Sequence, residues 1–149
     1  MKDTIYTQNR ELSWLRFNER VLEEAREKNV PAFEKLKFVS IFTSNLDEFF
    51  MIRVGSLYDQ TFLSKPQIDN KTGMDAAEQL SEIFRAVAPL YKKRDKIYRE
   101  VAGLLCEKGI AHPQMESLTD EERSFAEKYF IADVHPVLSP QILHAHPTL

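Results

Sequence analysis

The longest periodic stretch of the sequence, residues 80–105, is LSEIFRAVAPLYKKRDKIYREVAGLL. Apolar residues recur along it at alternating steps of four and three residues and form one stripe, which only Arg94 interrupts. The stripe consists of Leu80, Phe84, Val87, Tyr91, Arg94, Tyr98, Val101 and Leu105. A repeat that averages about 3.5 residues is typical of a helix that packs along another helix. The stretch therefore predicts a long helix over about residues 74–108, with Gly109 as its C-terminal stop.

Shorter apolar patterns before this stretch predict the helices that pack against it. The first helix follows Ser13, a good N-cap residue, and ends near Asn29. The second begins at Pro31, which suits a first helical position. Ser44-Asn45-Leu46-Asp47 has the spacing of a capping box, so either a third helix begins there or the second helix bends there.

Together these patterns predict an all-α fold, a bundle of about four helices. Residues 49–52 are apolar almost all round the helix and are expected to be buried, and residues 64–73 form the loop before the long helix. We expect the apolar stripes to meet in one core that contains Trp14, Phe17, Leu36, Phe49, Leu80 and Phe84.

The character of the sequence changes after Gly109. Residues 110–113 have the pattern of extended chain, and Thr119-Asp120-Glu121-Glu122 is a capping box that opens a short helix to about Ala132. Three prolines then interrupt the chain, which stops at Leu149 without a closing element. The sequence therefore predicts a helical domain over residues 1–108 and a truncated beginning of a second domain over residues 109–149.

Composition excludes several classes of protein. The 149 residues carry a net charge of −3, which argues against general nucleic-acid binding, and the four isolated glycines form no phosphate-binding loop. There is neither an apolar run long enough for a membrane span nor a signal peptide. The single cysteine, Cys106, forms no internal disulfide and is interpreted as an ordinary helix-face residue, which favours a cytoplasmic location.

Two clusters of polar residues are candidate sites. The histidines (His112, His135, His144 and His146) lack nearby cysteine or carboxylate ligands, so no metal site is predicted. The basic residues from Lys92 to Arg99 are interpreted as a solvated helix face that pairs with nearby acids. Arg94 is the exception, because it falls on the apolar stripe and is expected to meet an acid or a bound anion.

The segment Ser44-Asn45-Leu46-Asp47-Glu48-Phe49-Phe50 allows two interpretations. It is either a helix cap, in which Ser44 and Asp47 close a box, or part of a binding site. The amide of Asn45 offers a donor and an acceptor, which match the edge of an adenine base, and the neighbouring aromatic rings are suited to stacking on that base.

Several motifs resemble the beginning of polyphosphate kinase of the large, histidine-phosphorylating type. They are Glu11-Leu12-Ser13-Trp14-Leu15, Phe17-Asn18-Glu19-Arg20-Val21-Leu22, Glu34-Lys35-Leu36-Lys37-Phe38, Ser44 to Phe50 with Arg53, and His135-Pro136-Val137-Leu138-Ser139-Pro140. The resemblance spans most of the chain. In the tail, residues 139–147 keep only the outline of the family pattern.

The resemblance implies an enzyme several times longer that reversibly transfers the terminal phosphate of ATP to polyphosphate with the help of Mg²⁺. It implies that the N-terminal helical domain helps to roof the nucleotide site, that Asn45 contacts adenine, and that a mixed α/β head domain begins near Gly109. The phosphorylated histidine is expected outside these residues, so the 149 residues alone are expected to be inactive. The expected partners are ATP or ADP, polyphosphate, other domains of the same chain and a second subunit in a homo-oligomer.

The alternative is a freestanding helical module without catalysis. In that case the stripe from Leu80 to Leu105 is a partner-binding or dimerisation face.

Overall fold

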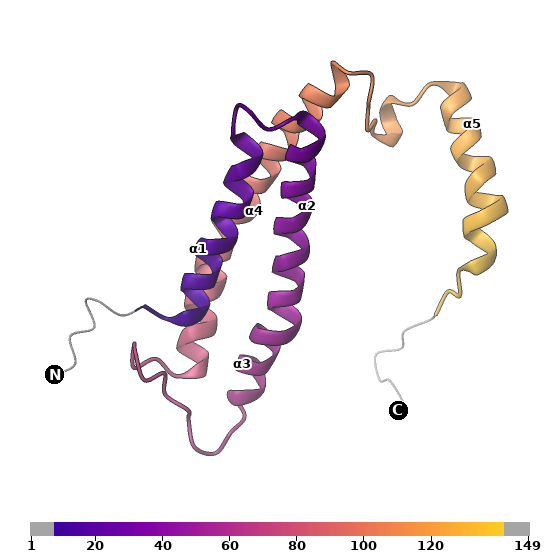
Figure 1. Cartoon of the computed structure of the whole chain (residues 1–149). Coiled ribbons are helices and arrows are strands. Elements are labelled where there is room, and N and C mark those ends of the chain that lie inside the picture. Colours follow the sequence, from indigo (N-terminus) through magenta and orange to yellow (C-terminus); the bar gives the residue numbers. More distant parts are fainter. Residues whose placement is uncertain (1–7, 142–149) are drawn as a thin grey trace. The chain divides into compact units, whose positions relative to one another are not determined.

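The structure is a computed structural model and describes residues 8–141. Every element in that range is helical and none is a strand, which confirms the predicted all-α fold. The chain divides into two compact units, one ending at Ala111 and the other beginning at His112. The first unit holds α1 (Arg10–Glu23), α2 (Ala32–Phe49), α3 (Gly55–Gln60) and α4 (Ala76–Cys106), and the second holds α5 (Asp120–Tyr129) (Figure 1).

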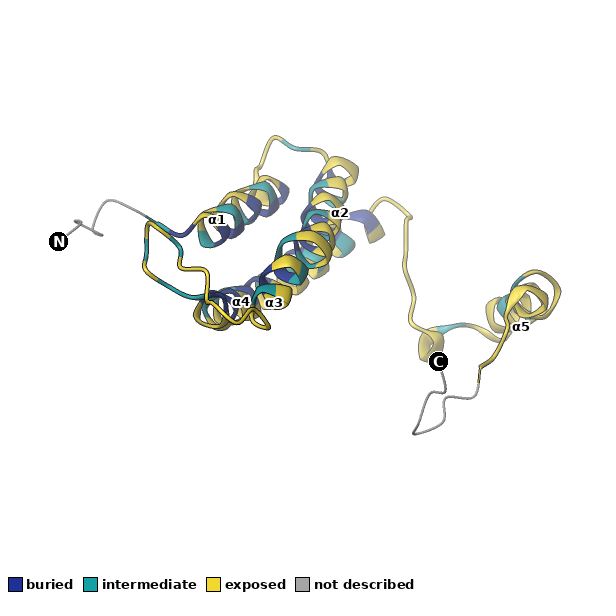
Figure 2. Ribbon diagram, turned by 90° about the horizontal axis from the view of Figure 1, so that it is seen from below, coloured by how far each residue is buried: buried dark blue, intermediate teal, exposed yellow. Residues whose placement is uncertain are grey.

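The first unit is a bundle of α1, α2 and α4, which run alternately up and down (Figure 1). A π-helical turn, Phe50–Val54, joins α2 directly to α3, so α3 continues the line of α2 and packs on α4. Helix α1 contacts both α2 and α4, and these two contact each other. The buried faces of the three long helices turn toward one another (Figure 2).

The core of this bundle includes two of the six residues that the sequence predicts for it, Phe49 and Leu80. Trp14 and Leu36 are partly buried and pack against the core. Phe17 and Phe84 are wrong predictions, because their side chains are 49% and 55% exposed. The largest fully buried side chains are Phe42, Leu15, Leu22, Leu46, Ile83, Ile97, Val101 and Asn18.

The error at Phe84 concerns only part of the predicted stripe, because Leu80, Val87, Val101 and Leu105 are buried as expected. The buried face of α4 passes through Ile83 and Leu90, each one residue before the predicted Phe84 and Tyr91, and keeps the same rhythm of three and four. Neighbouring residues on a helix point about 100° apart, so a shift by one position moves a side chain from the core to the rim.

Helix α1 begins earlier than predicted. Asn9, not Ser13, is the N-cap residue, and its Oδ1 accepts hydrogen bonds from the backbone N–H groups of Glu11 (2.9 Å) and Leu12 (3.2 Å). The helix also ends before Asn29, at Glu23, and a 3₁₀ turn, Glu24–Arg26, follows. The buried Lys35 of α2 secures this end, because its Nζ donates to the carbonyl oxygens of Ala25 (3.1 Å) and Glu27.

The predicted helix start at Ser44 is wrong, because α2 runs without a break from Ala32, directly after Pro31, to Phe49. Phe42, Leu46 and Phe49 lie on one buried face, so packing continues the helix through the possible cap. Residues 49–52 are also not all buried. Phe49 lies in the core, whereas Met51 and Ile52 are exposed, because this turn packs on one side only.

The ends of α4 depend on local chemistry. Asp75 and Glu78 form a capping box, in which Asp75 Oδ1 accepts from the N–H of Glu78 (2.8 Å) and Glu78 Oε2 accepts from that of Asp75 (3.0 Å). At the other end Gly109 adopts φ +80°, and the N–H of Ile110 bonds to the carbonyl of Leu105 (3.0 Å). This confirms Gly109 as the stop, since the left-handed region favours glycine.

In the second unit α5 begins at the predicted capping box, where the Thr119 side chain accepts from the N–H of Glu122. A π-helical turn, Phe130–Val134, and a 3₁₀ turn, His135–Val137, follow. The assignment of this second unit to a head domain stays a prediction. No helix in the described part of the chain has both the length and the apolar character of a membrane span.

Candidate functional site

Asn45 lies near the C-terminal end of α2 and takes part in a chain of hydrogen bonds. Its Nδ2 donates to Oδ1 of Asn18 on α1, at 3.0 Å. Nδ2 of Asn18 in turn donates to the backbone carbonyl of Phe42, also at 3.0 Å. Asn18 is fully buried, whereas Asn45 is half-buried and borders the surface.

An open hollow of about 310 Å³ lies beside Asn45. It is lined by Trp14, Phe17, Asn45, Glu48, Phe49, Ile52 and Arg53. The rings of Trp14 and Phe49 stack at a centroid distance of 4.5 Å and an interplanar angle of 5°. The hollow therefore combines aromatic rings with one side-chain amide, a set of groups that suits a flat, polar-edged ligand.

The prediction that Ser44 and Asp47 form a helix cap is wrong. Both side chains are exposed on the outer side of α2, in the interior of the helix rather than at its start. The polar residues of this segment thus have different surroundings, since Asn45 and Glu48 line the hollow and Asp47 does not. The interpretation of Asn45 as a binding residue stays a prediction.

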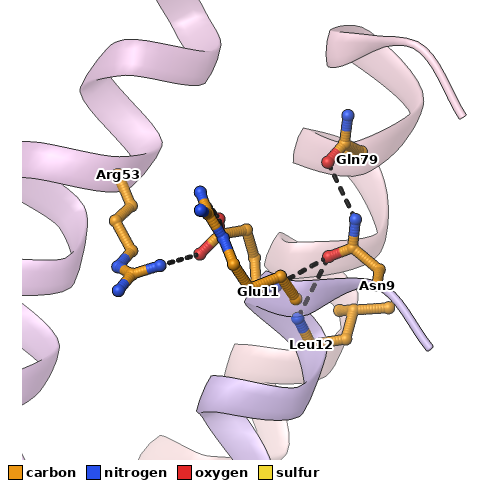
Figure 3. A network of polar contacts seen from close by, with 6 residues as sticks. Asn9, Glu11, Leu12, Arg53 and Gln79 are labelled. Carbon is orange, nitrogen blue, oxygen red and sulfur yellow. Dashed lines mark hydrogen bonds and ion pairs between the residues drawn. The ribbon is translucent and has the colours of Figure 1, made fainter. Parts of the chain in front are cut away.

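A second polar network lies at the start of α1 (Figure 3). Oε2 of the buried Glu11 is 3.2 Å from Nη1 of Arg53, and Oε1 of Glu11 is 2.8 Å from Nη2 of Arg10. Asn9, which caps α1, donates through Nδ2 to Oε1 of Gln79 on α4 at 2.8 Å (Figure 3). The network thereby connects α1 to α4 and to the π-helical turn after α2.

This network borders a larger open hollow of about 740 Å³. Arg53 and Ile52 line both hollows, so the π-helical turn forms a wall that the two share. The sequence indicates Glu11 and Arg53 only as parts of the matching motifs, and it does not indicate Asn9 and Gln79 as site residues. Asn9 was detectable as a cap-forming residue type, whereas the sequence gives no signal for its contact with Gln79, 70 positions away.

Two basic residues of the predicted cluster on α4, Lys93 and Arg94, are paired with acids. Lys93 Nζ lies 2.7 Å from Glu19 Oε1 and 2.6 Å from Glu23 Oε1 on α1. Burial alone would lower the pKa of Lys93, but its hydrogen bonds and charge interactions with the two glutamates outweigh burial and raise it. Arg94 meets Asp95 at 2.7 Å and lies over the Tyr91 ring, which confirms the expected acid partner.

The described histidines, His112 and His135, are exposed in the second unit, and His144 and His146 lie outside the described residues. Cys106 is exposed in the last turn of α4. Within residues 8–141, no three His, Cys, Asp or Glu side chains gather as metal ligands would.

Comparison with known proteins places this bundle in a family. The family model described as "Polyphosphate kinase N-terminal domain" matches residues 7–112. The chain is similar to polyphosphate kinases of Bacillus cereus (46% identity over 147 residues) and Halalkalibacterium halodurans (42% over 147 residues), each match covering 98% of the chain and 21% of the relative. A polyphosphate kinase of Thermosynechococcus vestitus is 41% identical over 144 residues, 95% of the chain and 20% of the relative. The chain thus spans about a fifth of the length of these relatives, and its match to the family model shows that it belongs to the polyphosphate kinase family, of which it carries the N-terminal domain.

Proposed function

We propose that the chain is the part of a polyphosphate kinase that holds the adenine end of ATP. The relatives carry the name of an enzyme that acts on polyphosphate, and the domain matched here is the N-terminal one. The observation that carries the adenine assignment is the position of Asn45 in the hollow, beside the stacked rings of Trp14 and Phe49.

The chemistry of the hollow fits an adenine base. The edge of adenine presents an amino donor, N6, next to a ring acceptor, N7, and an asparagine amide pairs with both. Asn45 uses one N–H for Asn18, which leaves its second N–H and its carbonyl oxygen for a ligand. Stacking of a base on an aromatic ring contributes about 1–3 kcal/mol, so the half-exposed ring of Phe17, which also lines the hollow, supplies affinity while the amide supplies selectivity.

We assign the phosphoryl transfer itself to other residues of the enzyme. A histidine nitrogen attacks the γ-phosphorus of ATP, the bond between that phosphorus and the β–γ bridging oxygen breaks, and ADP leaves. A terminal oxygen of polyphosphate then takes the phosphoryl group from the histidine. Mg²⁺ offsets the charge of the phosphates when it is bound with ATP. The residues of this chain bind and orient the base.

The outer surface of the bundle suits contacts with the rest of the enzyme or with a second subunit. Met51, Ile52 and Phe62 are exposed apolar residues near the end of α2 and α3. In contrast, the stripe that the alternative function requires as a free face is largely occupied, because Leu80, Val101 and other members are buried inside the bundle. The unpaired Cys106 is in keeping with a reducing, cytoplasmic location.

The test is steady-state kinetics of Asn45→Ala in the full-length kinase, with Asp47→Ala as the matched control on the same helix. An amide that touches the base far from the reacting phosphate binds ground and transition states alike, so its loss raises KM for ATP and leaves kcat nearly unchanged. Loss of one or two neutral hydrogen bonds predicts a rise of roughly 2- to 100-fold. An unchanged KM in Asn45→Ala, or an equal rise in Asp47→Ala, would contradict the adenine assignment.

A further inference from the structure

Asn18 is a buried polar residue for which the proposed function has no direct use. It lies on α1, is 0% exposed, and therefore cannot touch a ligand in the hollow itself. Yet both ends of its amide are bonded, Nδ2 to the Phe42 carbonyl and Oδ1 to Nδ2 of Asn45, each at 3.0 Å. Asn18 therefore links the backbone carbonyl of Phe42 on α2 to the side chain of Asn45, the residue proposed to contact the base.

This chain of bonds has a fixed direction. The carbonyl of Phe42 only accepts hydrogen bonds, and as part of α2 it does not turn over. Asn18 must therefore point its NH₂ group at Phe42 and its oxygen at Asn45. Asn45 must in turn point its NH₂ group at Asn18. Turning either amide over would bring two oxygens or two NH₂ groups together at a buried position, where unpaired polar groups are costly.

We propose that Asn18 is a positioning residue, one that fixes the orientation of the Asn45 amide and thereby makes the site prefer adenine to guanine. This inference rests on the proposed contact between Asn45 and the base. With the NH₂ group of Asn45 held by Asn18, its carbonyl oxygen is presented to the ligand as an acceptor. Adenine meets that oxygen with its N6 amino donor, whereas guanine presents the acceptor O6 at the same place.

Guanine would fit if the Asn45 amide turned over and offered NH₂ to O6. That rotation places the oxygen of Asn45 against the oxygen of Asn18, which Phe42 prevents from turning away. Without Asn18, the amide of Asn45 is free to present either end to the ligand. A site built to pair with one hydrogen-bonding pattern rejects the other because polar groups are left unpaired, and that penalty disappears with Asn18.

The experiment compares kcat/KM for ATP and for GTP in the full-length kinase and in its Asn18→Ala variant. Both nucleotides are assayed on the same preparation, so a loss of folded enzyme cancels in the ratio. We expect the preference for ATP to fall roughly 2- to 10-fold, the range of one hydrogen bond. Asn18→Ser, which removes less volume, replaces Asn18→Ala if the latter does not fold, and the same fall is expected.

Two further variants separate positioning from folding. Leu22→Ala removes another fully buried side chain of α1 and should lower the melting temperature while leaving the ATP to GTP ratio unchanged. Asn18→Asp keeps an oxygen toward Asn45 and, when protonated, an O–H toward Phe42, so it should retain the preference for ATP. A fall in the ratio for Leu22→Ala, or an unchanged ratio for Asn18→Ala or its serine substitute, would overturn the positioning role.

The variant Asn45→Ala distinguishes this inference from the proposed function. If Asn45→Ala changes neither KM for ATP nor the nucleotide preference, the adenine contact itself is wrong, and the role of Asn18 falls with it. If Asn45→Ala raises KM and abolishes the preference while Asn18→Ala leaves the preference intact, Asn45 contacts the base and only the positioning by Asn18 is wrong.

Discussion

The carboxylate of Glu11 and the guanidinium of Arg53 form an ion pair at 3.2 Å, although the two residues are 42 positions apart. The Glu11 side chain is only 6% exposed, and that of Arg53 is 38% exposed. Arg53 belongs to the turn that lines both hollows, and Glu11 belongs to the first turn of α1. The pair therefore connects the start of the bundle to the wall beside the candidate nucleotide site.

Loss of Arg53 should destabilise the bundle. Arg53→Gln leaves the buried Glu11 carboxylate with only its contact to Arg10, and hydrogen bonds to charged groups contribute about 1.5–3 kcal/mol. We expect the free energy of unfolding of the 149-residue chain, measured with urea, to fall by about 1–3 kcal/mol. Arg10→Gln is the control, since Arg10 is largely exposed and its loss should cost less than about 1 kcal/mol. Equal effects of the two variants would refute the structural role of the Glu11–Arg53 pair.

Truncation of aromatic residues should distinguish the core from its rim. Phe49 is almost fully buried and stacks on Trp14, so Phe49→Ala should cost about 3–5 kcal/mol and lower the melting temperature strongly. Phe84→Ala should cost less than half as much, because that ring is half exposed and meets Phe50 at the edge of the core. Lys92→Ala, at an exposed site, should stay within about 0.5 kcal/mol. Thermal melts of the three variants suffice, and a larger loss for Phe84→Ala than for Phe49→Ala would contradict the packing.

The contribution of Lys93 to stability should depend on alkaline pH. Burial opposes the charge of Lys93, but Glu19 and Glu23 raise its pKa above the ordinary value of 10.5. A group whose pKa is raised by folding stabilises the protein fully below its unfolded pKa and loses that effect as pH rises through its folded pKa. The difference in unfolding free energy between the wild type and Lys93→Met should therefore be constant from neutral pH to near 10.5 and shrink above it. If the difference in unfolding free energy also stayed constant above pH 10.5, the contribution of Lys93 would come from packing alone.

The 149-residue chain should not become phosphorylated. Transfer of a γ-phosphoryl group needs cationic groups and a metal placed around it. The resemblance places the phosphorylated histidine outside these residues, and the two described histidines, His112 and His135, are exposed in the second unit. Incubation with γ-labelled ATP and Mg²⁺, followed by analysis under alkaline conditions that preserve phosphohistidine, should find no label. A labelled histidine at His112, His135, His144 or His146 would place the nucleophile within this sequence.

The helices, their caps and the connecting loop were predictable to the extent that they depend on neighbouring residues. The box at Thr119 and the stop at Gly109 each involve side chains or backbone within one or two turns, so the sequence displays all of their parts. The cap at Ser44 failed although its residue types were suitable. A possible cap interrupts a helix only where the residues beyond it do not pack in helical form. The residues of α2 beyond Ser44 continue the helix, and α2 packs on α1 and α4.

The sequence by itself determined that the chain is an all-helical bundle with one long helix, because apolar residues recur at the spacing of a helix face. The tertiary structure alone decided which of two neighbouring positions faces the core, and it buries Ile83 instead of Phe84 and Asn18 instead of Phe17. A period is a property of one segment, but its phase depends on the helices packed against it. The same holds for the bonds from Asn18 to Phe42 and Asn45, 24 and 27 positions away, since a buried amide is stable only where distant chain supplies its partners.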